Sequence, residues 1–193
     1  TFNTTAASSA NITPAALMLT AVSDTKVYDG GVSSAVTPSQ AGLAGGDTVS
    51  SLTQSFASKN VLGANASTLN VNSGYAVNDG NGGGNYAVTL VPAVGTITPM
   101  ALTVSASGVN KVYDATASAT VTLTDNRVAG DVLSTAAGSA VFNTRHAGVA
   151  KPVAVSGITL SGADAGNYTF NTTAASSANI TPAALTLTAV SDT

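Results

Sequence analysis

A lysine, a tyrosine and an aspartate recur together and are the first candidates for chemistry. The tetrapeptide Lys-Val-Tyr-Asp occupies residues 26–29 and returns 85 residues later at 111–114. A Tyr-Asp pair could form a site, but a structural role explains it better. A buried ring fills a core while its hydroxyl fixes a loop, and aspartate begins turns by accepting backbone N–H bonds. The expected structural residues are Lys26, Tyr28 and Asp29 in the first copy and Lys111, Tyr113 and Asp114 in the second. Both tyrosines should be mostly buried, in equivalent positions.

Catalytic sets are hard to assemble from the remaining residues. His146 is the only histidine, so any Ser-His-Asp triad must use it, yet its counterpart in the first repeat is Asn60. The chain has no cysteine for nucleophilic catalysis and no glutamate for a paired-carboxylate mechanism. We therefore expect neither an enzyme nor a cofactor.

A glycine-rich segment, residues 79–85, resembles an oxygen-ligand loop for calcium. An EF-hand needs a bidentate glutamate at its twelfth position, which this chain cannot supply. The corresponding turn, residues 162–166, is shorter and has one carboxylate. A turn is the favoured interpretation, with calcium as the alternative.

Asparagine-linked glycosylation triplets mark further candidate positions. Such triplets arise easily in a chain rich in Asn, Thr and Ser, so they are weak indicators of modification. They begin at Asn3, Asn11, Asn65, Asn167, Asn171 and Asn179.

A tandem repeat positions all of these residues. Ile-Thr-Pro followed by an alternating apolar segment occurs three times, beginning at Ile12, Ile97 and Ile180. Gly-Asn-Tyr occurs twice, and its tyrosines, Tyr86 and Tyr168, fall at core-like positions. A self-similar period of about 84 residues indicates an array of compact modules, because a β-solenoid rung is much shorter.

Each Ile-Thr-Pro is the predicted joint between two modules. Pro14, Pro99 and Pro182 restrict the preceding residue to extended conformations, so one module should run almost directly into the next. This predicts an extended rod.

The two ends of the chain are nearly identical. Residues 1–25 match residues 169–193 except that Met18 becomes Thr186. We therefore predict that residues 1–14 are the tail of a preceding module and residues 183–193 the first strand of a following one, with module one at 15–99 and module two at 100–182. Neighbouring identical repeats should continue the array head to tail, with Phe2 in surroundings like those of Phe170.

Composition predicts an all-β protein. Charged residues make up 8% of the chain, apolar residues 44%, and the mean hydropathy is +0.30, which argues against disorder. A net charge of −3 offers no basic face for nucleic acid. No apolar run approaches the ~20 residues of a membrane span. Glu is absent and Lys and Arg are scarce among the helix formers, whereas β-branched residues are plentiful, which favours strands.

Alternating apolar residues locate several strands. Period-two patterns at 17–22, 86–91, 102–106 and 120–124 predict half-buried strands. Further strands are expected at 48–56 and 67–71, and residues 38–48 read as a loop.

The motifs together resemble the YDG-type repeat domains, which in turn resemble the MBG repeats of large bacterial filamentous-haemagglutinin-like adhesins. The matching features are Lys-Val-Tyr-Asp-Gly, the steps from Phe56 to Lys59 and from Phe142 to Arg145, residues 157–168, and Ile-Thr-Pro-Ala-Ala-Leu. Two departures are Asp114-Ala115 in place of Asp-Gly and the divergent segment 69–84.

The resemblance implies small β-rich modules, either an Ig-like sandwich or a β-grasp-like variant. It implies a structural stalk in a secreted adhesin on the bacterial cell surface, often linked to aggregation and biofilm. The alternative is a module that binds surface glycans or matrix polysaccharide through a polar strand face. Glycan sites commonly present aromatic platforms, whereas the chain has no tryptophan and only Tyr75 lacks a repeat counterpart.

Overall fold

The computed structural model describes residues 8–189, which divide between Thr98 and Pro99 into two compact units. Every regular element in this part of the chain is a β-strand except for one 3-10 turn, Ala165–Asn167. The prediction of an all-β chain is confirmed. Within residues 8–189 there is no helix of the length and apolarity needed to cross a membrane.

Module one contains nine strands. They are β1 (Ala15–Thr20), β2 (Thr25–Val27), β3 (Ser39–Ala41), β4 (Thr48–Ser50), β5 (Gln54–Phe56), β6 (Ser67–Val71), β7 (Ala76–Asn78), β8 (Tyr86–Val91) and β9 (Ala93–Thr98). Strands β1, β6 and β8 form where the sequence predicts them. Two predictions are wrong: the segment read as a loop contains β3, and the single strand expected at 48–56 is interrupted after Ser50, since Ser51 has a φ of +56° that a strand does not accommodate.

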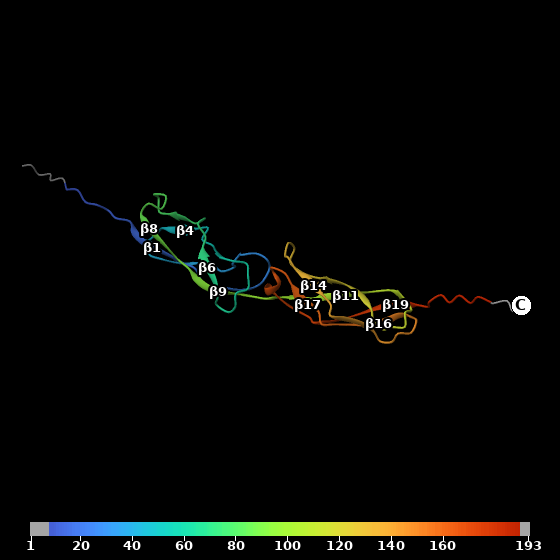
Figure 1. The fold of residues 1–193 in the computed structure, drawn as a ribbon. Helices are drawn as coiled ribbons and strands as arrows, with labels where there is room; N and C mark the ends of the chain where they lie inside the picture. Colours follow the sequence, from blue (N-terminus) through green and yellow to red (C-terminus); the bar gives the residue numbers. More distant parts are fainter. Residues whose placement is uncertain (1–7, 190–193) are drawn as a thin grey trace, which may run out of the picture. The chain divides into compact units, whose positions relative to one another are not determined.

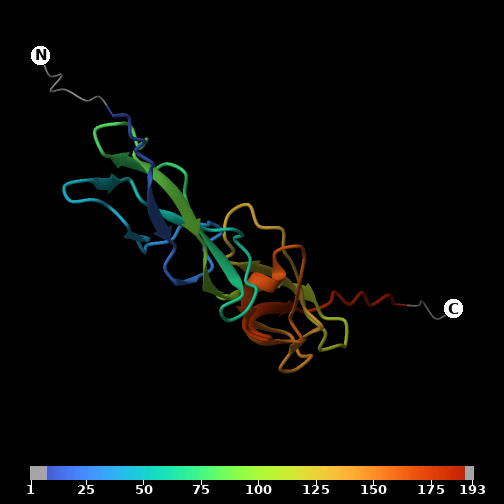
Figure 2. The same cartoon turned by 90° about the vertical axis from the view of Figure 1, so that its left-hand side faces the viewer.

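The first two strands of module one pair with its last two. β1 lies parallel to β8 and antiparallel to β3, while β2 lies parallel to β9. Strands β9, β6 and β5 continue as an antiparallel sheet, and β4 pairs with β7. Figures 1 and 2 show β1 and β8 side by side where the chain enters this module, with β9 leading out at the other end of it.

Module two repeats this plan with ten strands. They are β10 (Met100–Leu102), β11 (Val104–Val109), β12 (Lys111–Val112), β13 (Thr120–Asp125), β14 (Ser134–Ala136), β15 (Ser139–Phe142), β16 (Gly148–Ser156), β17 (Thr159–Ser161), β18 (Tyr168–Phe170) and β19 (Thr173–Thr181). The sheet β12-β19-β16-β15 corresponds strand for strand to β2-β9-β6-β5, and β14-β17 corresponds to β4-β7.

One strand of module one is divided in module two. Where β1 pairs with both β8 and β3, the shorter β10 pairs with β18, and β11 pairs with β13. β13 is also longer than β3, because Pro38, which lacks the N–H that a sheet ladder uses, precedes β3 in module one.

Each module has its own core, made by the inward positions of its strands. Leu17 and Leu19 are 1% and 0% exposed, whereas Met18 between them is 48% exposed, as period-two alternation requires. The buried residues of module one also include Tyr28, Phe56, Leu69, Tyr86 and Ile97; those of module two include Leu102, Val104, Phe142, Val153, Val155, Ile158, Tyr168 and Ile180.

Candidate functional site

The lysine and aspartate of the repeated motif close a turn after β2. Lys26 Nζ lies 2.7 Å from Asp29 Oδ1 and donates hydrogen bonds to the carbonyls of Gly31 and Ser33 at 3.1 and 3.3 Å. Asp29 Oδ1 also accepts the N–H of Gly31 at 2.8 Å. The hydrogen bond from Lys26, followed by that from Gly31, lowers the pKa of Asp29. Both charges are used within the turn.

The same arrangement recurs after β12. Lys111 Nζ lies 2.8 Å from Asp114 Oδ1 and donates to the carbonyls of Thr116 and Ser118 at 3.0 and 2.8 Å. Asp114 Oδ1 accepts from the N–H and the hydroxyl of Thr116, both at 2.9 Å. The Lys111 hydrogen bond, followed by those from Thr116, lowers the pKa of Asp114 to about 2. The motif is therefore an ion-paired turn in both modules.

The second turn has Ala115 where the first has glycine, and this residue adopts an unfavourable backbone conformation. Ala115 has a φ of +66° where module one places Gly30 at +78°. An L-residue other than glycine rarely adopts this conformation. The Thr116 hydroxyl, which Gly31 lacks, supplies additional hydrogen bonds at the same turn.

The two motif tyrosines are not equally buried. Tyr28 is 2% exposed, and Lys59 Nζ lies 5.8 Å from the centre of its ring. Tyr113 is partly exposed, so both side chains are mostly buried, as expected, but to different degrees. The loop after Phe56 is two residues longer than its counterpart, and Arg145, at the position of Lys59, is exposed. Module two thus leaves its tyrosine less covered.

A lysine also covers the phenylalanine beneath each motif. Lys26 Nζ lies 5.9 Å from the centre of the Phe56 ring, and Lys111 Nζ lies 5.6 Å from that of Phe142. A cation over an aromatic face is attracted by the ring quadrupole. The motif lysine therefore joins the turn to the core.

The Gly-Asn-Tyr tyrosines hold a second loop. The hydroxyl of Tyr86 donates to Asp47 Oδ2 at 2.6 Å and accepts the N–H of Ala44 at 2.8 Å. Tyr168 repeats this with Asp131 Oδ2 at 2.6 Å and the N–H of Val128 at 3.0 Å. The hydrogen bond to the Asp47 carboxylate raises the pKa of Tyr86.

The three joint prolines lie at strand boundaries and are exposed. Pro14 directly precedes β1, Pro99 is the single residue between β9 and β10, and Pro182 directly follows β19. These are positions where the missing N–H of proline interrupts no ladder.

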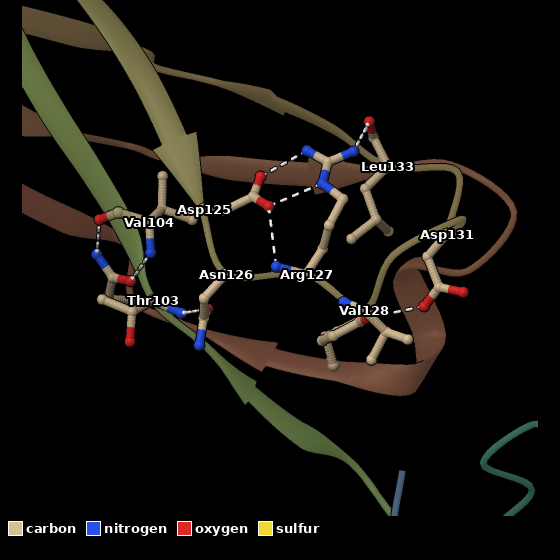
Figure 3. A network of polar contacts seen from close by, with 10 residues as sticks. Thr103, Val104, Asp125, Asn126, Arg127, Val128, Asp131 and Leu133 are labelled. Carbon is tan, nitrogen blue, oxygen red and sulfur yellow. Dashed lines mark hydrogen bonds and ion pairs between the residues drawn. The ribbon is translucent and has the colours of Figure 1, made fainter. Parts of the chain in front are cut away.

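An ion pair that the sequence analysis missed lies at the end of β13 (Figure 3). The Asp125 side chain is 3% exposed and accepts from Arg127 Nε at 2.7 Å and Nη2 at 2.5 Å. Arg127 Nη1 donates to the Leu133 carbonyl at 2.6 Å. The hydrogen bond from Arg127 lowers the pKa of Asp125.

Comparison of the two repeats could have revealed this pair. The backbone N–H groups of Ala44 and Val128 donate to the hydroxyls of the two Gly-Asn-Tyr tyrosines, so these two residues are equivalent. The same alignment pairs Leu43 with Arg127 and Ala41 with Asp125. Two apolar residues in one copy are therefore replaced by two opposite charges in the other. Such a joint replacement predicts that the side chains are in contact.

Two side-chain amides act as substitutes for strand pairing, and neither was predicted. Gln54, 2% exposed, accepts the N–H of Val22 at 2.7 Å and donates to its carbonyl at 2.7 Å. Asn171 makes the same two bonds to Val104, at 2.7 and 2.9 Å, and also donates to Thr173. The Asn171 amide is thus engaged within the fold, which argues against its use as a glycan acceptor.

The calcium alternative is disfavoured by the partners of Asp79. Its Oδ1 accepts the N–H groups of Asn81 and Gly83 at 2.9 and 2.8 Å, and its Oδ2 accepts that of Asn85 at 3.1 Å. These bonds, that of Gly83 foremost, lower the pKa of Asp79. The carboxylate organises its own turn, and residues 8–189 contain no group of three or more histidine or acidic side chains placed to hold a metal ion.

A shallow groove of about 620 Å³ lies in module two. Its lining comes from Ala119 and residues 120–123 of β13 on one side and from residues 135–140 on the other. The lining residues are uncharged, and Thr120, Thr122 and Thr135 contribute hydroxyl groups. None of them is aromatic.

The sequence of each module matches one recognised domain. A family model described as the YDG domain matches residues 13–93 and again residues 98–176. The chain belongs to the YDG domain family. The ion-paired turns and the tyrosine–aspartate contacts therefore recur in two YDG domains of one chain. No match is found among curated proteins or among solved structures.

Proposed function

We propose that the YDG modules of this chain are structural spacers in the stalk of a secreted bacterial surface adhesin or filament, where they support adhesion, cell aggregation and biofilm. Within this proposal the modules are Ig-like sandwiches or β-grasp-like variants and follow one another as an extended rod. The supporting observation is the joint: β9 ends at Thr98 and β10 begins at Met100, so one residue separates the strands of successive modules.

The internal use of the polar side chains also supports a spacer. Lys26, Asp29, Tyr86 and Asp47 each satisfy a partner within their own module. Polar side chains that already have partners within the module are less able to bind a ligand. The net charge of −3 likewise favours no nucleic-acid partner.

Exposed residues near the joints support continuation by neighbouring identical repeats. Ile12 is 98% exposed, whereas Ile97 and Ile180 at the same repeat position are 1% and 2% exposed. Leu185 and Leu187 are 83% and 87% exposed, and their counterparts in module one are buried. An adjoining module would cover these side chains. The related prediction for Phe2 falls outside the described residues.

Scattering from arrays of increasing length tests the spacer. We expect the largest dimension to grow by a constant increment for each pair of YDG modules added. An array whose dimension grows no faster than that of a compact particle would contradict the rod and the spacer function with it.

A glycan-binding module is the second candidate, and the groove between β13 and residues 135–140 favours it. Its threonine hydroxyls can donate and accept hydrogen bonds. A glycan array with the two-module protein and with Thr122→Val separates the candidates. Binding that Thr122→Val abolishes would favour recognition, and no binding would favour the spacer.

A further inference from the structure

Each module is entered and left through strands that are hydrogen-bonded neighbours. In module one the chain enters through β1 and β2, residues 15–27, and leaves through β8 and β9, residues 86–98. Each of these two runs is interrupted once, at residues 21–24 and at Pro92. The two runs are parallel throughout, in β1 with β8 and in β2 with β9.

The ladder between these runs is nearly continuous. Residues 15–20 pair in register with 86–91, and residues 25–27 pair with 96–98. Backbone bonds bridge the interruption: the N–H of Ala21 donates to the Val91 carbonyl at 2.8 Å, and that of Thr96 donates to the Asp24 carbonyl at 2.9 Å. The ladder closes where Tyr28 N–H donates to the Thr98 carbonyl at 2.9 Å.

The direction of the strands decides how tension acts on this ladder. The chain enters at the Ala15 end and leaves at the Thr98 end, and in a parallel pair these lie at opposite ends of the ladder. Pulling the two points apart slides one run along the other. All the backbone bonds then carry the load together, whereas peeling from one end would break them in succession.

Buried side chains on both runs oppose the same sliding. Leu17 and Leu19 belong to the entering run, Tyr28 directly follows it, and Tyr86 and Ile97 belong to the leaving run; all are 8% exposed or less. A shift of one residue would turn each inward side chain toward the opposite face of its strand. Sliding therefore disrupts the core and the ladder at once.

We propose that each YDG module is a force-bearing element, in which the parallel entering and leaving strands form a mechanical clamp loaded in shear. This proposal rests on the proposed stalk function, because a stalk transmits tension between a surface and its target. It goes beyond that function, since a spacer need only hold a distance.

Module two has a weaker clamp of the same design. Its parallel ladder is limited to residues 100–102 with 168–170 and residues 111–112 with 180–181. Between these two short ladders, side chains make the hydrogen bonds. The Asn171 amide bonds both the N–H and the carbonyl of Val104, and Asn110 Oδ1 accepts the N–H of Asn179 at 2.7 Å. Fewer backbone bonds share the load, so we expect module two to rupture at lower force than module one.

Force spectroscopy on the full chain with two pulling directions tests the clamp. The chain has no cysteine, so introduced cysteines give unique attachment points. Thr13→Cys with Pro99→Cys loads module one in shear, and Thr13→Cys with Asn85→Cys peels β8 from β1; all three positions are exposed. We expect the shear rupture force to exceed the peeling force roughly twofold or more at equal loading rate, because forced unfolding follows the barrier along the pulled direction. Equal forces in the two directions would overturn the proposal.

A matched pair of proline substitutions, at two alanine positions, tests the clamp without new attachment sites in the module. Ala15 and Ala76 are both exposed and both begin a strand, β1 and β7. Ala15→Pro removes the 2.8 Å bond from Ala15 N–H to the Asn85 carbonyl in the clamp, and Ala76→Pro alters the β4–β7 pair outside it. With the full chain pulled from its ends, we expect Ala15→Pro to accelerate forced unfolding of module one roughly tenfold, the effect of losing one good hydrogen bond, and Ala76→Pro to leave it unchanged. The reverse ranking would overturn the clamp.

Failure of the clamp and failure of the spacer are distinguishable. Equal rupture forces with a constant scattering increment per module pair would remove the clamp and leave the spacer. A compact array with direction-dependent rupture forces would remove the spacer and leave the mechanical property of each module.

Discussion

The Tyr86 hydroxyl lies 2.6 Å from Asp47 Oδ2, and the two residues join the start of β8 to the loop before β4. Tyr168 and Asp131 repeat this contact at the same distance. A contact conserved between two diverged copies of one chain fixes the loop in both modules. Its removal is the simplest test of what stabilises a YDG module.

Replacing Tyr86 with phenylalanine removes the hydroxyl and leaves the ring in the core. We expect the thermal midpoint of module one to fall by roughly 4–8 °C, the shift that the loss of about 1 kcal/mol produces in a domain of this size. Calorimetry of the two-module chain measures this change, with Tyr75→Phe as the control because Tyr75 has no repeat counterpart. Equal shifts in both variants would contradict the assignment.

Removal of the buried amide of Gln54 should destabilise module one. Gln54→Ala leaves the N–H and carbonyl of Val22 without their side-chain partners. Unsatisfied buried groups cost about 1–3 kcal/mol, and we expect the free energy of unfolding to fall by this amount. Chemical denaturation gives the value, and Gln40→Ala, at an exposed position of β3, is the matched control.

The unequal burial of the motif tyrosines predicts unequal costs of truncation. Tyr28→Ala should cost about 3–5 kcal/mol, as for a large side chain in a packed core. Tyr113→Ala should cost less, since Tyr113 is partly exposed. Hydrogen exchange resolved by peptide reports each module separately, and an equal loss of protection in the two modules would contradict this ranking.

The ion pair at the end of β13 should depend on both partners. Arg127→Leu leaves the Asp125 carboxylate buried without its cation, which is strongly destabilising. The double variant Asp125→Ala with Arg127→Leu reproduces the Ala41 and Leu43 of module one, and we expect it to recover most of the lost thermal stability. A double variant that is less stable than either single variant would show that the two positions do not act as a pair.

Acid should weaken module two through Asp114. Its pKa falls from 3.8 to about 2 on folding. The stability that the carboxylate contributes is therefore present above pH 3.8 and is lost as the pH falls from 3.8 toward 2. The measurement is the thermal midpoint of module two against pH: Asp114→Asn should flatten the profile in this window and leave module one unchanged. If the thermal midpoint of the Asp114→Asn variant falls with pH as steeply as that of the unsubstituted chain, the prediction is wrong.

Local patterns predict the strands better than they predict the pairing. The alternation at Leu17 and Leu19 locates β1 because the period of a strand is read from neighbouring residues. The parallel pairing of Ala15 with Tyr86 joins residues far apart in the chain, and no local pattern encodes it. β3 escaped prediction because the glycine and proline around it indicate a loop.

For the site residues too, the sequence predicts positions better than it predicts contacts. The repeat locates Tyr86 but not its contact with Asp47, which depends on how two distant segments approach. Asn171 reads as a glycosylation triplet, since nothing local indicates that its amide replaces a strand bond to Val104. Asp125 and Arg127 become visible only when the two modules are compared.

The pairing of Ala15 with Tyr86 also sets the order of events during synthesis. The ribosome releases β1 some seventy residues before its parallel partner, so the strand with Leu17 and Leu19 waits with an open edge. Contacts this distant in sequence form slowly. In an array of similar repeats the waiting strand meets the closing strands of other modules first, and a swapped pair is the characteristic misfold of such chains. Divergence between the two YDG modules, such as the divided β10 and β11 in place of β1, should therefore disfavour exchange between them.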